Sequence, residues 1–273
     1  MADNPTDLAG RIAELKRERR AVILAHYYTT PDVLCPDKRV LIPCPEAGCS
    51  LAESCPAAEF AAFKARYPGH TVVSYVNTTV GVKALTDICC TSSNALRVVE
   101  SIPREQPVIF APDRNLGAYI RKLTGRDNMV LWDGACHVHE EFSLEKILAL
   151  RREHPAARIV AHPECKAPVV AAADFVGSTA AILDYCGSAG ADEFIVVTEP
   201  GILAEMKRRY PRKRFIPAPP TDSTCGCNDC RYMKMVTLAN IAECLEKMAP
   251  EVVIDEPTRR LAERSILNMI RIK

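Results

Sequence analysis

Two stretches of the chain repeat the same order of apolar runs and polar residues. Tyr75 lies at the end of the apolar run TVVSYVN, and Ser92 follows it further along the chain. His162 lies near the end of RIVAHPE, and Thr179 follows it at an identical separation. Chance periodicity does not place polar residues at strand ends so regularly. Because a repeat at fixed spacing indicates one supersecondary unit used more than once, we expect the two stretches to fold alike.

Within each stretch, strand-length runs alternate with segments of helical spacing. The predicted strands are 71–77, 88–93, 107–112 and 129–136 in the first stretch and 158–164, 173–178, 193–198 and 214–219 in the second. Alternation of this kind is typical of parallel α/β units. Ligands usually bind at the carboxyl ends of parallel strands, so the polar residues at these ends are candidate site residues.

A third, shorter unit precedes these two. A helix is predicted over 6–19, and the run AVILAHYY at 21–28 places His26 at a strand end, as in the later copy. Cys49 follows His26 closely in the sequence. In the two later units, far more residues lie between the polar residue at the strand end and the cysteine, and the two numbers are nearly equal. The first unit therefore lacks roughly 40 residues of the repeat pattern, including a strand and its flanking helices.

The predicted fold is thus α/β, with three similar parallel-sheet units of which the first is incomplete. The units span 1–68, 69–156 and 157–250, and helices in 251–273 are expected to complete the first. The net charge is +1 without a long block of one sign, so nucleic acid and anionic membrane surfaces are not expected partners. The apolar runs are strand-length, so no segment is expected to span a bilayer.

Thirteen cysteines and a start without a secretory signal predict a reducing compartment, the cytoplasm. Cysteines there bind metals, catalyse or are simply buried.

Cys49, Cys136 and Cys230 each follow a strand and a loop, one in each unit. Cubane clusters ordinarily take four cysteines, so three converging thiolates would leave one iron open. Burial is expected for most of the others, namely Cys35, Cys44, Cys55, Cys89, Cys90, Cys186 and Cys244.

The run Cys225, Cys227 and Cys230 also permits two other interpretations. It could belong to a zinc site, although no fourth ligand follows at zinc-ribbon spacing. Alternatively, Cys225 and Cys227 could form a redox-sensitive thiol pair with each other or with Cys230. The spacing alone leaves these interpretations open.

Two pairs of polar residues share an i, i+2 spacing, which places both members on one side of a strand. Tyr75 and Asn77 form the first pair, and a tyrosine packed in the core is the alternative there. His162 and Glu164 form the second, with Pro163 between them. A carboxylate that fixes an imidazole tautomer suits general acid–base work, and an ordinary surface pair is the alternative.

Ser92 and Thr179 each stand at the start of a helix-like segment that follows a strand. Each could offer a hydroxyl and backbone amides to a carboxylate or a phosphate, since helix N-termini bind anions. The alternative is an ordinary N-cap, which stabilises its helix by about 1 kcal/mol.

Eight motifs together resemble the quinolinate synthase family, in order and over nearly the whole chain. The motifs are HYY (26–28), EAGCSLAESCP (46–56), SYVNTT (74–79), TSSNA (91–95), WDGACHVHEEF (132–142), AHPEC (161–165), GST (177–179) and CNDCRYMKM (227–235). The resemblance implies three similar domains around a pseudo-threefold axis, with a central [4Fe–4S] cluster. It implies the condensation of iminosuccinate (iminoaspartate) with dihydroxyacetone phosphate to quinolinate, phosphate and water in NAD biosynthesis. It also implies functional coupling to an L-aspartate oxidase or aspartate dehydrogenase.

The resemblance assigns roles residue by residue. Cys49, Cys136 and Cys230 correspond to the cluster ligands, the last because it directly precedes the segment RYM. The open iron would bind a substrate oxygen and assist dehydration. Substrate binding falls to His26, Tyr75, Val76, Asn77, Ser92, His162, Pro163, Glu164 and Thr179, and catalysis to His26, Tyr28, Tyr75, His162 and Glu164. His139, three residues after Cys136, could approach the cluster.

The missing stretch is where the family carries a GDS-type loop, whose serine contacts iminosuccinate, and an HFM-type segment. Neither motif is found here. Loss of one serine contact to a charged substrate would cost roughly 1.5–3 kcal/mol of binding. The hypothesis is a quinolinate synthase with an internal deletion. The rival classes are another [4Fe–4S] hydro-lyase and a cluster-binding protein that the deletion has inactivated.

Overall fold

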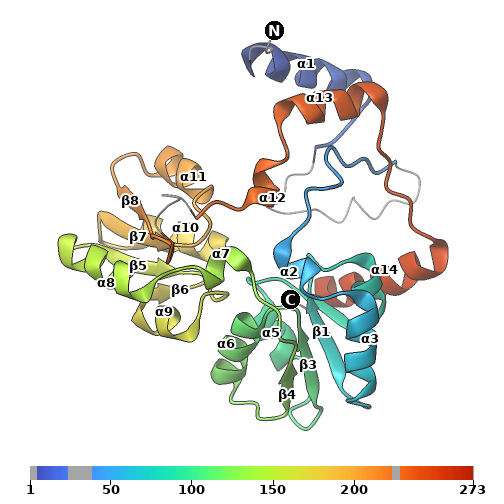
Figure 1. Ribbon diagram of the computed structural model, residues 1–273, viewed down its shortest axis with the longest axis horizontal. Coiled ribbons are helices and arrows are strands. Elements are labelled where there is room, and N and C mark those ends of the chain that lie inside the picture. Colours follow the sequence, from blue (N-terminus) through green and yellow to red (C-terminus); the bar gives the residue numbers. More distant parts are fainter. Residues whose placement is uncertain (1–4, 24–38, 223–227, 273) are drawn as a thin grey trace. The chain divides into compact units, whose positions relative to one another are not determined.

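The computed structural model describes residues 5–23, 39–222 and 228–272 (Figure 1). They fall into two compact units. The smaller unit contains the described residues of 1–48 together with 231–256, and the larger contains those of 49–230 together with 257–273. The predicted strand 21–28 lies mostly outside the described residues, as do His26 and Tyr28; its described part, 21–23, is not a strand.

The first sheet of the larger unit consists of four parallel strands. These are β1 (Thr71–Tyr75), β2 (Ile88–Cys90), β3 (Val108–Ala111) and β4 (Met129–Leu131). Their order is β2-β1-β3-β4, so the chain crosses over the sheet between β2 and β3. Its neighbours in the sequence are the helices α2 (Ser50–Glu53), α3 (Ala57–Ala65), α4 (Val80–Ala84), α5 (Ala95–Glu100), α6 (Arg114–Thr124), α7 (His137–Glu140) and α8 (Leu144–Glu153).

The second sheet repeats the first. Its strands are β5 (Arg158–Ala161), β6 (Phe175–Val176), β7 (Glu193–Val197) and β8 (Arg214–Pro217), again all parallel. Their order is β6-β5-β7-β8, the equivalent of the first sheet (Figure 1). The helices around it are α9 (Ala167–Ala172), α10 (Thr179–Ser188) and α11 (Ile202–Arg209). The α/β class with parallel sheets is therefore confirmed. The division into three units and the pseudo-threefold axis stay predictions.

A partly buried aspartate contact marks the repeat in three dimensions. The carboxylate of Asp87 accepts a hydrogen bond of 2.8 Å from the backbone N–H of Val72, in β1. Asp174 does the same for Ile159 in β5, at 2.7 Å. Both pairs are 15 residues apart in the chain. Because each aspartate directly precedes the edge strand beside it, the contact ties the start of β2 or β6 to the central strand.

Both faces of each sheet are covered, which explains why the strand sequences are apolar throughout. In β1, Val73 belongs to one buried cluster and its neighbour Val72 to another on the opposite face. In β5, Ile159 and Val160 divide in the same way. Alternate residues of a strand point to opposite faces, so each sheet needs two apolar layers.

Among the cysteines expected to be buried, Cys55, Cys89, Cys90, Cys186 and Cys244 are buried. Cys44 is only half-buried, which corrects the expectation for that residue. Cys35 lies outside the described residues. The described cysteines are free thiols.

The smaller unit is built on two helices. Helix α1 (Pro5–Glu18) packs on α13 (Leu238–Lys247) through buried Leu15 and Leu245, among others. Leu41 and Glu251 form an antiparallel bridge in the same unit. The helix predicted over 6–19 is confirmed as α1. The short helix α12 (Arg231–Lys234) also belongs here.

The last helix, α14 (Glu256–Arg271), packs mainly on the first sheet of the larger unit. Ser265 Oγ lies 3.2 Å from Cys89 Sγ, and Asn268 donates a hydrogen bond of 2.9 Å to the backbone oxygen of Asp87. The sequence predicts helices within 251–273, and α14 confirms a helix there; its part in completing the first predicted unit stays a prediction. None of the helices in the described part of the chain is long and apolar enough to cross a membrane.

Candidate active site

The equal spacing of the repeat brings two predicted site residues together. Tyr75 ends β1, and its hydroxyl donates a hydrogen bond of 3.4 Å to Ser92 Oγ, in the loop after β2. Burial raises the pKa of Tyr75, and the negative charge of Glu164 raises it further. Tyr75 is therefore a neutral hydroxyl donor at the carboxyl edge of its sheet, and it interacts electrostatically with Glu164, which follows a strand of the second sheet.

Asn77 links the edge of the first sheet to the first predicted cluster ligand. Its Nδ2 donates to Cys49 Sγ over 3.3 Å, while its Oδ1 is buried and has no hydrogen-bond partner among the described residues. Burial raises the pKa of Cys49, and the nearby Cys136 and Glu164 add to this. Cys49, Cys136 and Glu164 therefore belong to one electrostatic neighbourhood.

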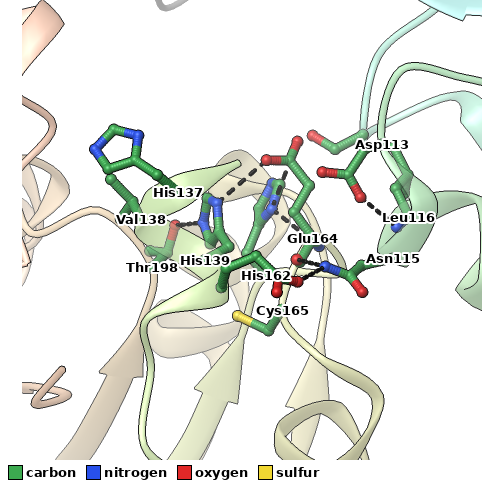
Figure 2. A network of polar contacts seen from close by, with 12 residues as sticks. Asp113, Asn115, Leu116, His137, Val138, His139, His162, Glu164, Cys165 and Thr198 are labelled. Atoms are coloured by element: carbon green, nitrogen blue, oxygen red, sulfur yellow. Dashed lines mark hydrogen bonds and ion pairs between the residues drawn. The ribbon is translucent and has the colours of Figure 1, made fainter. Parts of the chain in front are cut away.

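His139 and Glu164 form the centre of a buried polar network (Figure 2). His139 Nε2 lies 3.1 Å from Thr198 Oγ1, and its Nδ1 lies 3.2 Å from Glu164 Oε2. The ring of His162 stacks on that of His139 with centroids 4.7 Å apart. Figure 2 shows both imidazoles beside the Glu164 carboxylate. The predicted pair His162 and Glu164 is buried, so the surface-pair alternative is wrong.

The pKa values of the two histidines are shifted in opposite directions. Burial lowers the pKa of His139, but its contacts with Cys136 and Glu164 together outweigh burial and raise that pKa well above the usual value. Burial lowers the pKa of His162, and the positive charge of His139 lowers it further. These two effects outweigh the negative charge of Glu164, which raises the pKa, so the pKa of His162 falls to about 4. Near neutral pH, His139 is protonated and His162 is neutral. Two neighbouring groups with separated pKa values are a typical acid and base pair.

Two further predicted site residues, Pro163 and Val76, lie next to residues of the network in the chain. Pro163 is buried between His162 and Glu164, and Val76 continues the ladder of β1 by donating to Cys90 O at 2.8 Å. Glu164 N donates to His162 Nδ1 at 3.4 Å.

Neither Ser92 nor Thr179 is the N-cap of its helix, which corrects that alternative. Asn94 occupies the cap position of α5, and Ser178 caps α10 by accepting a hydrogen bond from the Ala181 N–H. Thr179 is the first residue of α10 and is half-buried. The helices begin at a slightly different position than the periodicity suggested. The hydroxyls of Ser92 and Thr179 therefore do not cap these helices.

The three predicted cluster cysteines share a local setting. Cys49 and Cys136 are the N-cap residues of the four-residue helices α2 and α7, and Cys230 directly precedes α12, also of four residues. All three are half-buried. Cys136 and Cys230 pack against the same apolar cluster of the second sheet. Cys225 and Cys227 lie outside the described residues, so their pairing stays a prediction.

Sequence reasoning missed two residues that support this site. Asp113 follows β3; one carboxylate oxygen accepts from the Leu116 N–H at 2.7 Å, and the other is buried without a hydrogen-bond partner in the structure. Burial and then Glu164 raise the pKa of Asp113 to about 7. Asn115 donates 3.0 Å to the backbone oxygen of Glu164 and also contacts Glu140. Their position after β3, a third strand end, was the available signal.

The arrangement therefore joins thiols, an acid–base pair of histidines and hydroxyl donors at the carboxyl ends of two sheets. A family model described as quinolinate synthetase A protein matches residues 29–271. The chain belongs to the quinolinate synthase family. Similar relatives include the quinolinate synthases of a Synechococcus species, 48% identical, and of Thermosynechococcus vestitus, 47% identical; each alignment covers 98% of this chain and 96% of the relative. The quinolinate synthase of a Nostoc species is 46% identical.

These alignments run over 307 positions, whereas the chain has 273 residues. At least 34 residues of each relative are therefore aligned with gaps in this chain. This shortfall agrees in size with the stretch missing from the repeat. The alignment length does not place the gaps, and the internal deletion stays a prediction. Iron–sulfur dependence belongs to the family, and the half-buried cysteines are consistent with it.

Proposed function

We propose that this chain is a quinolinate synthase that condenses iminosuccinate with dihydroxyacetone phosphate. One carbon–carbon bond and one ring carbon–nitrogen bond form, and the products are quinolinate, phosphate and two waters, so no oxidant is needed. The observation that carries the proposal is the buried pair of His139 and His162 around Glu164, which supplies an acid and a base beside predicted cluster thiols.

The donor set suits a [4Fe–4S] cluster held by Cys49, Cys136 and Cys230. The three are free, half-buried thiols, unlike most of the described cysteines, which are buried. The buried Oδ1 of Asn77 has no hydrogen-bond partner in the structure, beside Cys49, which is consistent with a further group at this position. When bound, such a cluster supplies a Lewis-acidic iron with an open coordination position.

Hydroxyl and amide donors are proposed to hold the substrate anions. The Tyr75 and Ser92 hydroxyls, 3.4 Å apart, form one donor pair, and Asn77 follows on the same strand edge. Thr179 begins the ten-residue helix α10, whose N-terminus adds a favourable field for a carboxylate or a phosphate. His26 and Tyr28 are proposed to complete the triose side.

The histidines are proposed to move the protons. Neutral His162 takes a proton from the substrate carbon as the new carbon–carbon bond forms, and Glu164 stabilises the charge that His162 gains. Protonated His139 donates its proton to a hydroxyl that then leaves as water, while solvent water takes the proton of the adjacent carbon–hydrogen bond and the electrons of that bond form the new double bond. General acid–base steps of this kind contribute typically about 10²–10⁴-fold in rate.

The test is anaerobic purification, iron and sulfide analysis, and an assay for quinolinate from iminosuccinate and dihydroxyacetone phosphate. Four irons per chain with product formation support the proposal. Full loading without product would favour the second candidate, an inactive cluster-binding protein, for which the shortened first unit is the supporting observation. Turnover of a hydroxy acid in place of these substrates would favour another hydro-lyase.

We further propose that an L-aspartate oxidase or aspartate dehydrogenase supplies the unstable imine, and that the enzyme works in the cytoplasm. The chemistry of the substrate supports the first point, because imines hydrolyse in water. Thirteen cysteines, of which all the described ones are free, support the second.

A further inference from the structure

Three different ligand types converge at one place in the larger unit. A ligand atom from each of Cys136, His139 and Glu164 lies within 4.8 Å of the other two. We propose that, in the cluster-free chain, these three residues bind a single divalent transition-metal ion of the zinc class. This site is different from the proposed cluster site, with which it shares only Cys136.

The distances need little adjustment to hold an ion. His139 Nδ1 and Glu164 Oε2 are 3.2 Å apart. In a tetrahedral zinc site with bonds of about 2.0–2.3 Å, neighbouring ligand atoms are separated by roughly 3.3–3.6 Å. The nitrogen–oxygen pair is therefore already near its coordinated spacing, and the sulfur has to approach by no more than about 1.3 Å, since no separation exceeds 4.8 Å.

The imidazole is held with the correct atom facing inward. Nε2 contacts Thr198 Oγ1 at 3.1 Å, and Nδ1 faces Cys136 and Glu164. When an ion displaces the proton of Nδ1, the proton that stays on Nε2 leaves the lone pair of Nδ1 directed toward the ion. Nδ1 is buried and approaches Glu164 without the geometry of a hydrogen bond. A ligating histidine usually donates its other N–H to a neighbouring oxygen in this way, which fixes its tautomer and its orientation.

The carboxylate is positioned as well. The Glu164 backbone is held on both sides, because its oxygen accepts from Asn115 and its N–H donates to His162. The side chains of His139 and Glu164 are only 8% and 7% exposed. A buried set that is already oriented binds an ion with little loss of side-chain entropy.

The donor chemistry selects the ion. One thiolate, one imidazole and one carboxylate suit Zn²⁺, Co²⁺ and Fe²⁺ rather than Mg²⁺ or Ca²⁺, which prefer oxygen ligands. Three protein ligands leave a fourth position for water. On binding, the Cys136 thiol loses its proton to solvent and His139 binds in its neutral form, so protons are released and no electrons move.

The consequence is competition. If Cys136 also ligates the cluster, as proposed above, one ion in this site and a complete cluster exclude each other. That consequence rests on the proposed function, whereas the binding of the ion does not.

Co²⁺ titration of the full-length, cluster-free chain under anaerobic conditions tests the proposal. We expect one ion per chain and a sulfur-to-metal charge-transfer band of the intensity of a single thiolate. X-ray absorption at the edge of bound Zn²⁺ should show one sulfur with nitrogen and oxygen neighbours. Three sulfurs around the ion would place it on the cluster thiolates and overturn the proposal, as would the absence of binding.

Variants separate the two sites. His139→Gln and Glu164→Gln should each weaken Co²⁺ binding at least tenfold, and Thr198→Val should weaken it about 10-fold through loss of orientation. Cys49→Ser is the matched control, because it removes a nearby thiol that is not in the set and should leave Co²⁺ affinity unchanged. Equal losses in Cys49→Ser and His139→Gln would contradict the assignment, and circular dichroism checks that each variant is folded. Because none of these measurements uses turnover, an inactive enzyme does not affect them.

Discussion

Asn115, in α6 beside the first sheet, donates a hydrogen bond of 3.0 Å to the backbone oxygen of Glu164, which follows the central strand of the second sheet. The same amide also contacts the Glu140 carboxylate, which Arg114 binds at 2.9 Å. The two halves of the site therefore meet through one side chain, and Asn115 is a positioning residue for Glu164.

Replacement of Asn115 should therefore affect turnover more than folding. In Asn115→Ala, loss of a neutral hydrogen bond corresponds to about 0.5–1.5 kcal/mol, or roughly a two- to twelvefold lower kcat/KM in the cluster-loaded enzyme. Asn115→Asp should be worse, because a second carboxylate would face Glu140. Steady-state assays with a thermal melt of each variant give the measurement. A kcat/KM equal to that of the parent enzyme in both variants would show that this tether does not position Glu164.

The low pKa of His162 predicts a pH-dependent stability. The folded chain resists protonation of His162 down to about pH 4, whereas the unfolded chain takes up that proton near pH 6.5. Because the unfolded state then binds more protons, the free energy of unfolding falls as the pH drops from 6.5 to 4. The contribution of this pKa shift to the free energy of unfolding is at most roughly 3–4 kcal/mol. Above pH 6.5 it is fully present.

Urea unfolding of the cluster-free chain at pH 7.5, 6.5, 5.5 and 4.5 measures this effect. His162→Gln is the control, because it cannot gain the proton while carboxylates elsewhere titrate as before. The stability difference between the parent chain and His162→Gln should shrink as the pH falls. If the stability difference between the two chains stays constant over this pH range, the pKa of His162 is the same in the folded and the unfolded chain, and the prediction is wrong.

The repeated aspartates predict effects of similar size in the two sheets, although Asp174 also pairs with Arg151 at 2.8 Å. Asp87→Ala leaves the Val72 N–H without its acceptor, and Asp174→Ala does the same for Ile159. Each should lower the free energy of unfolding by about 1–3 kcal/mol, the cost of an unsatisfied buried group. The double variant should show nearly the sum, since the two contacts share no partners. Chemical denaturation checks this, and a neutral Asp87→Ala would contradict the equivalence.

Cluster loading should depend on three cysteines among the ten that the structure describes. Cys49→Ser, Cys136→Ser and Cys230→Ser should each abolish retention of four irons after anaerobic reconstitution. Cys186→Ala is the control, since its thiol is buried in the apolar layer of the second sheet. Iron and sulfide per folded chain are the readout, and full loading in any of the three serine variants would remove that residue from the ligand set.

Much of the larger unit could be predicted from the sequence because its signals are local. The equal spacing of Tyr75 to Ser92 and of His162 to Thr179 reflects two sheets with equivalent strand order. The aspartate contacts could not be predicted, because Asp87 looks like any polar residue before a strand. Nor could the packing of α14 on the first sheet, since its amphipathic pattern does not say which face it covers.

The charge states at the site also lay beyond the sequence. A protonated His139 beside a neutral His162 results from burial and from the proximity of Glu164 and Cys136, which only the fold brings about. His139 could be suspected from its place three residues after Cys136, but Thr198, its partner, stands at the end of a strand 59 residues further along.

The predicted internal deletion can be tested by filling it. A chimera with the corresponding segment of the Synechococcus relative inserted between His26 and Cys49 should restore the missing serine contact and the segment that shields the site. One contact to a charged substrate is worth roughly 1.5–3 kcal/mol, which corresponds to about a 10- to 150-fold gain in kcat/KM. Iron content should stay the same, because all three cysteines are already present. If the chimera and the parent chain load equally and turn over equally, the missing segment is dispensable, and the first unit works in its short form.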